Sequence, residues 1–180
     1  MTASEYIQLR AFSRLDGLRL SILWLASFAC YVLGLRRPEL GMFAIGMAMF
    51  TPFLMAFRLR SFRDNVLDGA IGFGRGWVYL AFVSFYACII FALDQLIYFV
   101  WIDNGVFVSA LGEMVTNTES AVALKQLGLQ QTIEESLHLL SAMRPIDLVL
   151  NIMGSNLMIC CLLGLPVAAI MKRDRIRRVN

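Results

Sequence analysis

The chain has 180 residues, of which 59% are hydrophobic and only 16% are charged, and its formal net charge is +3. A soluble domain of this length is about half apolar and about a quarter charged, so the composition argues against a soluble globular protein. It predicts an all-α membrane protein with a single membrane domain covering residues 1–180. All four cysteines lie inside apolar blocks, which excludes a disulfide framework.

The first two apolar blocks cover about residues 18–35 and 41–57. Arg10, Arg14 and Arg19 form a basic leader to the first block, which makes a cleaved signal peptide the alternative interpretation. Because three further apolar blocks follow, we interpret the first as an uncleaved span. The second block is short for a span, and we expect Arg58 to extend it by placing its guanidinium among the headgroups. Pro52 should kink this helix.

The third block, residues 76–102, is the longest and follows a glycine-rich run. Trp77 and Tyr79 mark one of its ends, and Tyr98 and Trp101 mark the other. This spacing is typical of the aromatic side chains that line the two membrane–water interfaces.

Residues 103–144 leave the membrane before the fourth block, residues 146–171. Thr118 with Glu119 is a helix start signal and Gly128 a stop signal, so we expect helix over much of 118–143. Apolar side chains recur at helical spacing in its second half, opposite acids and a histidine, which predicts one or two amphipathic helices: Ile133, Leu137 and Leu140 against Glu134, Glu135 and His138. The expected fold is therefore four transmembrane helices with an extracytoplasmic amphipathic helical insert between the third and the fourth.

The distribution of Lys and Arg predicts the orientation. The leader holds three, the second connection four and the tail five, whereas the other two connections hold two each. Twelve against four is a strong positive-inside bias, so both termini are expected in the cytoplasm.

Two short apolar signatures carry a resemblance. The glycine-rich approach to the third span reads Gly72-Phe73-Gly74-Arg75-Gly76-Trp77, and the fourth span ends Gly164-Leu165-Pro166-Val167-Ala168-Ala169-Ile170-Met171-Lys172. With the four-span layout and the polar insert, the chain resembles the bacterial membrane family catalogued as domain of unknown function 4199. The resemblance implies a multi-pass protein of the bacterial inner (cytoplasmic) membrane with no established activity and no catalytic residues to carry over. Proteins of this kind are often encoded beside a family-2 glycosyltransferase, which suggests a partner.

An intramembrane polar cluster is the first candidate site. Asp94 and Gln95 lie in the outer third of the third span, and intramembrane acids often mark ion or substrate paths. The alternative is a polar clamp between helices. Three polar residues recur every four positions along one face of the fourth span: Asp147, Asn151 and Ser155.

The depth of these residues predicts two contacts. At about 1.5 Å rise per residue, Asp94 and Asn151 both fall about 6 to 8 Å beneath the outer boundary, so we expect them to meet. Arg144 and Asp147, one turn apart, should form a separate pair nearer the surface.

Small residues and basic flanks form the second group of candidates. Gly72 with Gly76 and Gly164 with Ala168 have the small-xxx-small spacing of closely packed membrane helices. The basic loop and tail are suited to anionic lipid, or serve only to fix the orientation. No P-loop lysine follows the glycines, and His138 is the single histidine, so neither a phosphate-binding motif nor a zinc site is predicted.

These patterns indicate no catalytic residues, no cofactor and no metal. We therefore expect a non-catalytic membrane protein, an accessory or scaffold subunit for another membrane protein such as an envelope glycosyltransferase. The alternative is a small oligomeric transporter or channel that uses Asp94 and the polar face of the fourth span. The expected partners are the lipid bilayer and another membrane protein or a second copy of the chain, and not nucleic acid.

Overall fold

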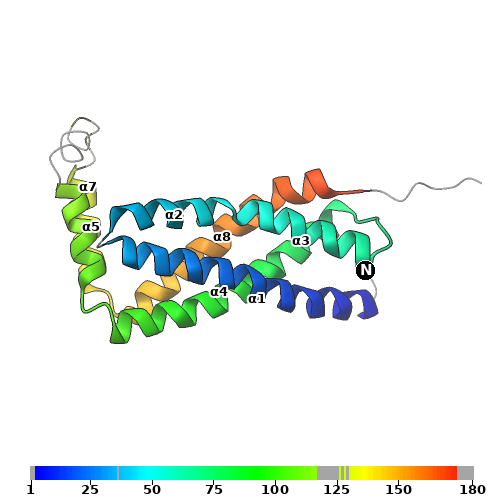
Figure 1. The fold of residues 1–180 in the computed structure, drawn as a ribbon, viewed down its shortest axis with the longest axis horizontal. Coiled ribbons are helices and arrows are strands. Elements are labelled where there is room, and N and C mark those ends of the chain that lie inside the picture. Colours follow the sequence, from blue (N-terminus) through cyan, green and yellow to red (C-terminus); the bar gives the residue numbers. More distant parts are fainter. Residues whose placement is uncertain (1–2, 36, 117–125, 127, 129, 174–180) are drawn as a thin grey trace, which may run out of the picture. The chain divides into compact units, whose positions relative to one another are not determined.

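The computed structural model describes residues 3–35, 37–116, 126, 128 and 130–173. Four helical segments are long and apolar enough to cross a membrane: Ser4–Gly34, Glu39–Val66, Phe73–Trp101 and Pro145–Met171. The chain is an all-α membrane protein, as the composition predicts, and Figure 1 shows its helices in chain order. It divides into two compact units, residues 1–91 with 153–180 and residues 92–152, which we describe separately.

The first unit contains α1 (Ala3–Gly34), α2 (Pro38–Met49), α3 (Thr51–Val66), most of α4 (Phe73–Trp101) and the second part of α8 (Pro145–Met171). Its core is a cluster of buried apolar side chains to which α1, α3, α4 and α8 contribute and α2 does not. The members with the least exposure are Leu9, Leu20, Met55, Leu59, Phe62, Tyr79, Leu80, Val83, Ala87, Cys88 and Ala168.

Helix α1 begins at Ala3, some fifteen residues before the apolar block that was expected to open the first span. The basic leader is therefore helical. Its buried side chains continue the spacing of the span, because Leu9, Ser13, Asp16, Leu20 and Trp24 recur at intervals of three or four. One face of α1 thus packs into the bundle from Leu9 to Trp24.

The second span is interrupted, as the position of Pro52 predicts. Helix α2 ends at Met49 and α3 begins at Thr51, with the proline in the first turn of α3, where its missing N–H costs no hydrogen bond. The expectation for the end of this span was wrong. Helix α3 continues to Val66, and the side chain of Arg58 is 18% exposed and faces the bundle instead of ending the helix among headgroups.

One end of the first unit is held together by one side-chain and two backbone hydrogen bonds. Arg63 donates from Nη1 to the carbonyl oxygen of Met171 at 2.9 Å, which satisfies an acceptor at the end of α8. Ile71 and Arg173 exchange two backbone N–H···O bonds of 2.9 and 3.0 Å. The α3–α4 connection and the end of α8 are therefore held together.

The second unit contains the rest of α4, α5 (Val106–Thr116), α7 (Gln130–Ala142) and the first turns of α8. The described part of the insert contains the helices α5 and α7, and α5 precedes the predicted start at Thr118–Glu119, which lies outside the described residues. Asp103 caps α5 by accepting the N–H groups of Gly105 and Phe107 at 3.1 and 2.9 Å. The sequence signal for this helix was therefore an aspartate at its start.

Helix α7 shows the predicted amphipathic pattern. Ile133, Leu137 and Leu140 are half-buried, whereas Glu135 and His138 are exposed. Helices α5 and α7 pack against each other. Their apolar faces thus gain part of their burial from one another.

Candidate functional site

A buried carboxylate lies at the centre of the first unit. Asp16 of α1 is 2% exposed, and its Oδ1 accepts from Nε of Arg58 at 2.8 Å and from Nη1 of Arg19 at 2.6 Å. Nη2 of Arg58 also lies 2.5 Å from this oxygen, and the hydroxyl of Tyr79 donates to Oδ2. Both carboxylate oxygens therefore have partners, contributed by α1, α3 and α4.

Close packing of the helices brings these partners together. A Cβ atom at Gly17 would lie 2.7 Å from Cβ of Tyr86 and 2.9 Å from the carbonyl oxygen of Val83, so only glycine fits where α1 meets α4. The ring of Tyr79 stacks on Phe62 with centroids 4.2 Å apart and planes 7° apart. Phe62 and Gly17 therefore hold Tyr79 and Asp16 within hydrogen-bonding distance.

The two arginines contribute differently to this network. The Arg58 side chain is 18% exposed and the Arg19 side chain 53% exposed. An exposed ion pair is screened by water and contributes little, whereas a buried carboxylate without a partner is costly. Arg58 is therefore the principal counterion. Because both oxygens of Asp16 have partners from three helices, the arrangement is suited to clamping α1, α3 and α4 together.

Asp16 was not predicted as a site residue, because its position falls in the basic leader before the first apolar block. The sequence does contain a signal for Asp16, because the interval of three or four residues between buried positions of the span continues upstream through Ser13 and Leu9. Asp16 lies on the same face of the helix as these buried positions, and a buried acid needs a cationic partner. Arg58 is the arginine of the second span that could supply it.

The predicted intramembrane polar cluster is only partly assembled. Asp94 is half-buried, while Asn151 and Ser155 are exposed, and no hydrogen bond joins Asp94 to Asn151 among the described residues. The predicted contact between the third and fourth spans is thus not found. Gln95 is 4% exposed, and its Oε1 is buried without a hydrogen-bond partner in the described part of the chain.

The surface pair predicted at the start of the fourth span is present. Arg144 donates to Asp147 from Nε at 2.7 Å and from Nη2 at 3.1 Å, in a two-pronged contact across one turn. Both side chains are largely exposed, at 78% and 43%. This pair is therefore a surface feature and contributes little to stability.

The predicted small residues divide into two groups. A Cβ atom at Gly76 would lie 3.6 Å from Cβ of Ala168, and one at Gly164 would lie 3.6 Å from Cβ of Leu80, so these three positions lie along the α4–α8 contact. Gly72 is different, because a Cβ atom there would meet nothing within 4 Å.

The aromatic belt expected at the start of the third span was wrong. Tyr79 is fully buried on Asp16, and Nε1 of Trp77 donates to the carbonyl oxygen of Cys161 at 3.0 Å. Both rings point into the bundle because their polar atoms find partners there.

Two apolar cavities lie along α2. The first, about 630 Å³, is a groove along α2 beside α1, and it is lined by Leu23, Glu39, Met42, Phe43, Gly46, Met47 and Phe50. The second, about 370 Å³, opens between α1, α2, α4 and α8, and Trp24, Ser27, Thr51 and Asn156 are among its lining residues. Neither cavity is lined by Asp94 or Asn151.

Comparisons with known proteins give one match. The model of a family described as "Protein of unknown function (DUF4199)" matches residues 15–173. No curated protein and no solved structure matches the chain. Among the described residues, no group of three or more His, Cys, Asp or Glu side chains is placed to hold a metal ion.

Proposed function

This chain belongs to the family of proteins of unknown function DUF4199, and we propose that it is a non-catalytic membrane subunit that binds and positions another membrane protein. The observation that carries the proposal is the open apolar groove along α2, about 630 Å³ in volume. A transmembrane helix of the partner is its proposed occupant.

The exposed face of α2 and α3 has the spacing of a helix-packing surface. Met42, Gly46, Met49 and Phe53 recur at intervals of four, three and four, and the three large side chains are 67–76% exposed. This is the a/d spacing along which two helices interlock. Gly46 has open space above it, so a partner backbone can approach α2 between the flanking methionines.

Lipid alone would not require this pattern. Acyl chains are satisfied by any apolar surface, whereas a glycine between large, flexible Met and Phe side chains forms a hole for a side chain of a facing helix. The interior of the first unit supports the same function, because its buried acid is engaged in a clamp and offers no free general acid or base.

The location and orientation are part of the proposal. Twelve of the sixteen Lys and Arg residues flank the two termini and the second connection, which supports a multi-pass protein with both ends in the cytoplasm. The family resemblance supports the bacterial inner membrane and an envelope glycosyltransferase as the partner.

Two matched glycine variants test the proposal. Gly46→Leu fills the hole in the groove, and Gly154→Leu adds the same side chain to an exposed glycine of α8 that also has open space above it. Each variant is purified in mild detergent, and the proteins that accompany it are identified by mass spectrometry. We expect Gly154→Leu to retain a stoichiometric membrane-protein partner and Gly46→Leu to lose it. Purification of the wild-type chain alone, or equal retention by both variants, contradicts the proposal.

A small transporter or channel is the second candidate, and one observation favours it. Gln95 has a buried oxygen without a partner in the described part of the chain, next to Asp94 in the sequence. Buried polar groups of membrane helices usually have partners, and exceptions can bind a ligand or an ion. Asp94→Asn should leave the protein folded. Ion or solute flux in proteoliposomes with the wild type that is lost in Asp94→Asn would support transport, and no flux with the wild type would exclude it.

A further inference from the structure

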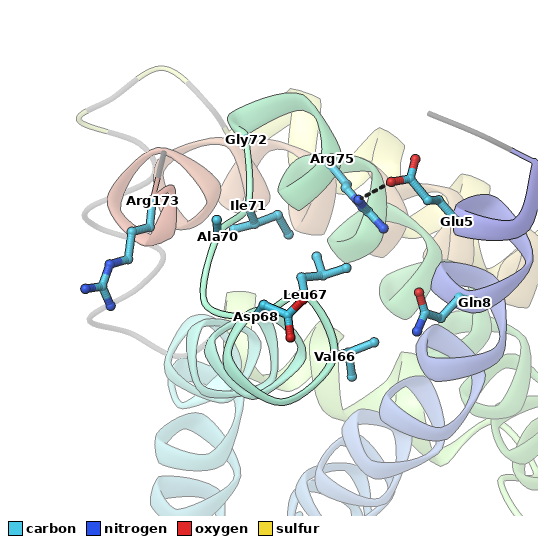
Figure 2. Close-up of a pocket in the computed structure, with 10 residues that line it drawn as sticks. All are labelled: Glu5, Gln8, Val66, Leu67, Asp68, Ala70, Ile71, Gly72, Arg75 and Arg173. Carbon is cyan, nitrogen blue, oxygen red and sulfur yellow. Dashed lines mark hydrogen bonds and ion pairs between the residues drawn. The ribbon is translucent and has the colours of Figure 1, made fainter. Parts of the chain in front are cut away.

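The bundle has a polar cavity at the end where α1 starts and α8 finishes. It measures about 430 Å³ and is lined by residues of α1, the α3–α4 connection and the first turn of α4. Figure 2 shows Arg75 reaching from α4 towards Glu5 of α1, with Gln8 one turn further along α1. We propose that this cavity binds the phosphate group of a phosphate-bearing ligand through Arg75.

Arg75 has donors left over for such a ligand. Its Nη1 donates to Oε1 of Glu5 at 3.2 Å, but Nε and Nη2 are buried and have no hydrogen-bond partner among the described residues. A guanidinium presents its N–H groups in a planar fork that matches two oxygens of a phosphate. Leaving two of these donors buried and unpaired is costly, so an acceptor in the cavity relieves that cost.

The surrounding backbone also favours an anion. Helix α4 begins at Phe73, so the N–H groups of its first turn have no acceptor within the helix. Together with the positive end of the helix dipole, they attract negative charge. Gly72 immediately precedes this turn and lines the cavity, and the open space above it leaves the backbone accessible.

The charges around the cavity define the ligand further. Arg75 and Arg173 are cationic, whereas Glu5 and Asp68 are anionic, so the lining is balanced in formal charge. A balanced lining favours a zwitterion, which places its phosphate on Arg75 and its cationic group near an acid. Phosphatidylethanolamine has both the phosphate and the cationic group, whereas free phosphate has no cationic group. The site is separate from the α2 groove, and its existence does not depend on the proposed partner.

Binding to the purified full-length protein in detergent tests the proposal, with inorganic phosphate and dihexanoyl phosphatidylethanolamine as separate probes. The signal is the tryptophan fluorescence, to which Trp77, two residues from Arg75, contributes, with thermal stabilisation as a second measurement. We expect saturable binding of the short-chain lipid and at least a tenfold weaker affinity in Arg75→Gln. Binding of both probes with mutual competition assigns the site to phosphate itself, and binding of the lipid alone assigns it to a headgroup.

Two further variants separate a direct contact from a structural effect. Gly72→Leu places a side chain in the cavity and should abolish binding, whereas Gly154→Leu in α8, which also meets open space but does not line this cavity, should leave binding unchanged. Absence of saturable binding to the wild type, or equal affinities of wild type, Arg75→Gln and Gly72→Leu, overturns the proposal.

Discussion

Replacing the buried acid tests the clamp that joins α1, α3 and α4. Asp16→Ala removes the acceptor of Arg58 and of the Tyr79 hydroxyl, and it leaves a largely buried guanidinium without a counterion. Breaking a buried ion pair from one side costs about 3–5 kcal/mol of unfolding free energy. We therefore expect Asp16→Ala and Arg58→Ala each to lose stability in this range.

The double replacement Asp16→Ala with Arg58→Ala has a different expected result. Because it leaves no unpaired charge, and only the Tyr79 hydroxyl still lacks its acceptor, its loss of stability should be well below the sum of the two single losses. The two sites are then coupled by about 3 kcal/mol or more, well above what independent sites show. Arg19→Ala is the internal control, because this arginine is 53% exposed and its ion pair is worth about 1 kcal/mol or less.

Unfolding by sodium dodecyl sulfate in mixed micelles, followed by tryptophan fluorescence, measures these differences. An equal loss of unfolding free energy in Arg19→Ala and Arg58→Ala would contradict the role of Arg58 as the principal counterion. If the double variant lost the sum of the two single losses, the carboxylate and the guanidinium would act independently, which would contradict the clamp.

The remaining predictions concern packing, the surface and topology. Gly17→Leu should cost about 1–3 kcal/mol or more in the same unfolding assay, because its Cβ alone would approach a backbone oxygen of α4 to 2.9 Å, whereas Gly112→Leu meets open space and should be tolerated. Arg144→Ala should leave stability nearly unchanged, since its pair with Asp147 is exposed and screened by water, and a clear loss would show that the pair is structural. A reporter active only outside the cytoplasm should work when fused after Gly112 and fail after Arg63, and the reverse result would overturn the orientation.

The sequence predicted the four spans because each is a long apolar block, and bilayer thickness leaves few alternatives for such blocks. It also predicted the break near Pro52 and the ion pair between Arg144 and Asp147, both of which depend on neighbours in the chain. These features are local, and helix geometry is sufficient to derive them.

The contacts between distant helices were predicted less well. Depth along two helices placed Asp94 and Asn151 at one level, but depth says nothing about rotation around each axis, and Asn151 faces outward. Asp16 was missed for a different reason, because composition placed the start of the first span at about residue 18, whereas the helix begins at Ala3. Its partners, Arg58 and Tyr79, are 42 and 63 residues away, a pairing that depends on which faces meet.

Photocrosslinking in intact cells tests the proposed binding surface most directly. A benzoylphenylalanine residue replaces Phe53 on the exposed face of α3, or Met158 on the exposed face of α8 as the control. We predict that position 53, after irradiation, gives a covalent adduct with one other membrane protein, identified by mass spectrometry, and that position 158 gives none. Adducts with lipid alone at both positions, or with a second copy of this chain at position 53, would contradict the claim that this surface binds another membrane protein.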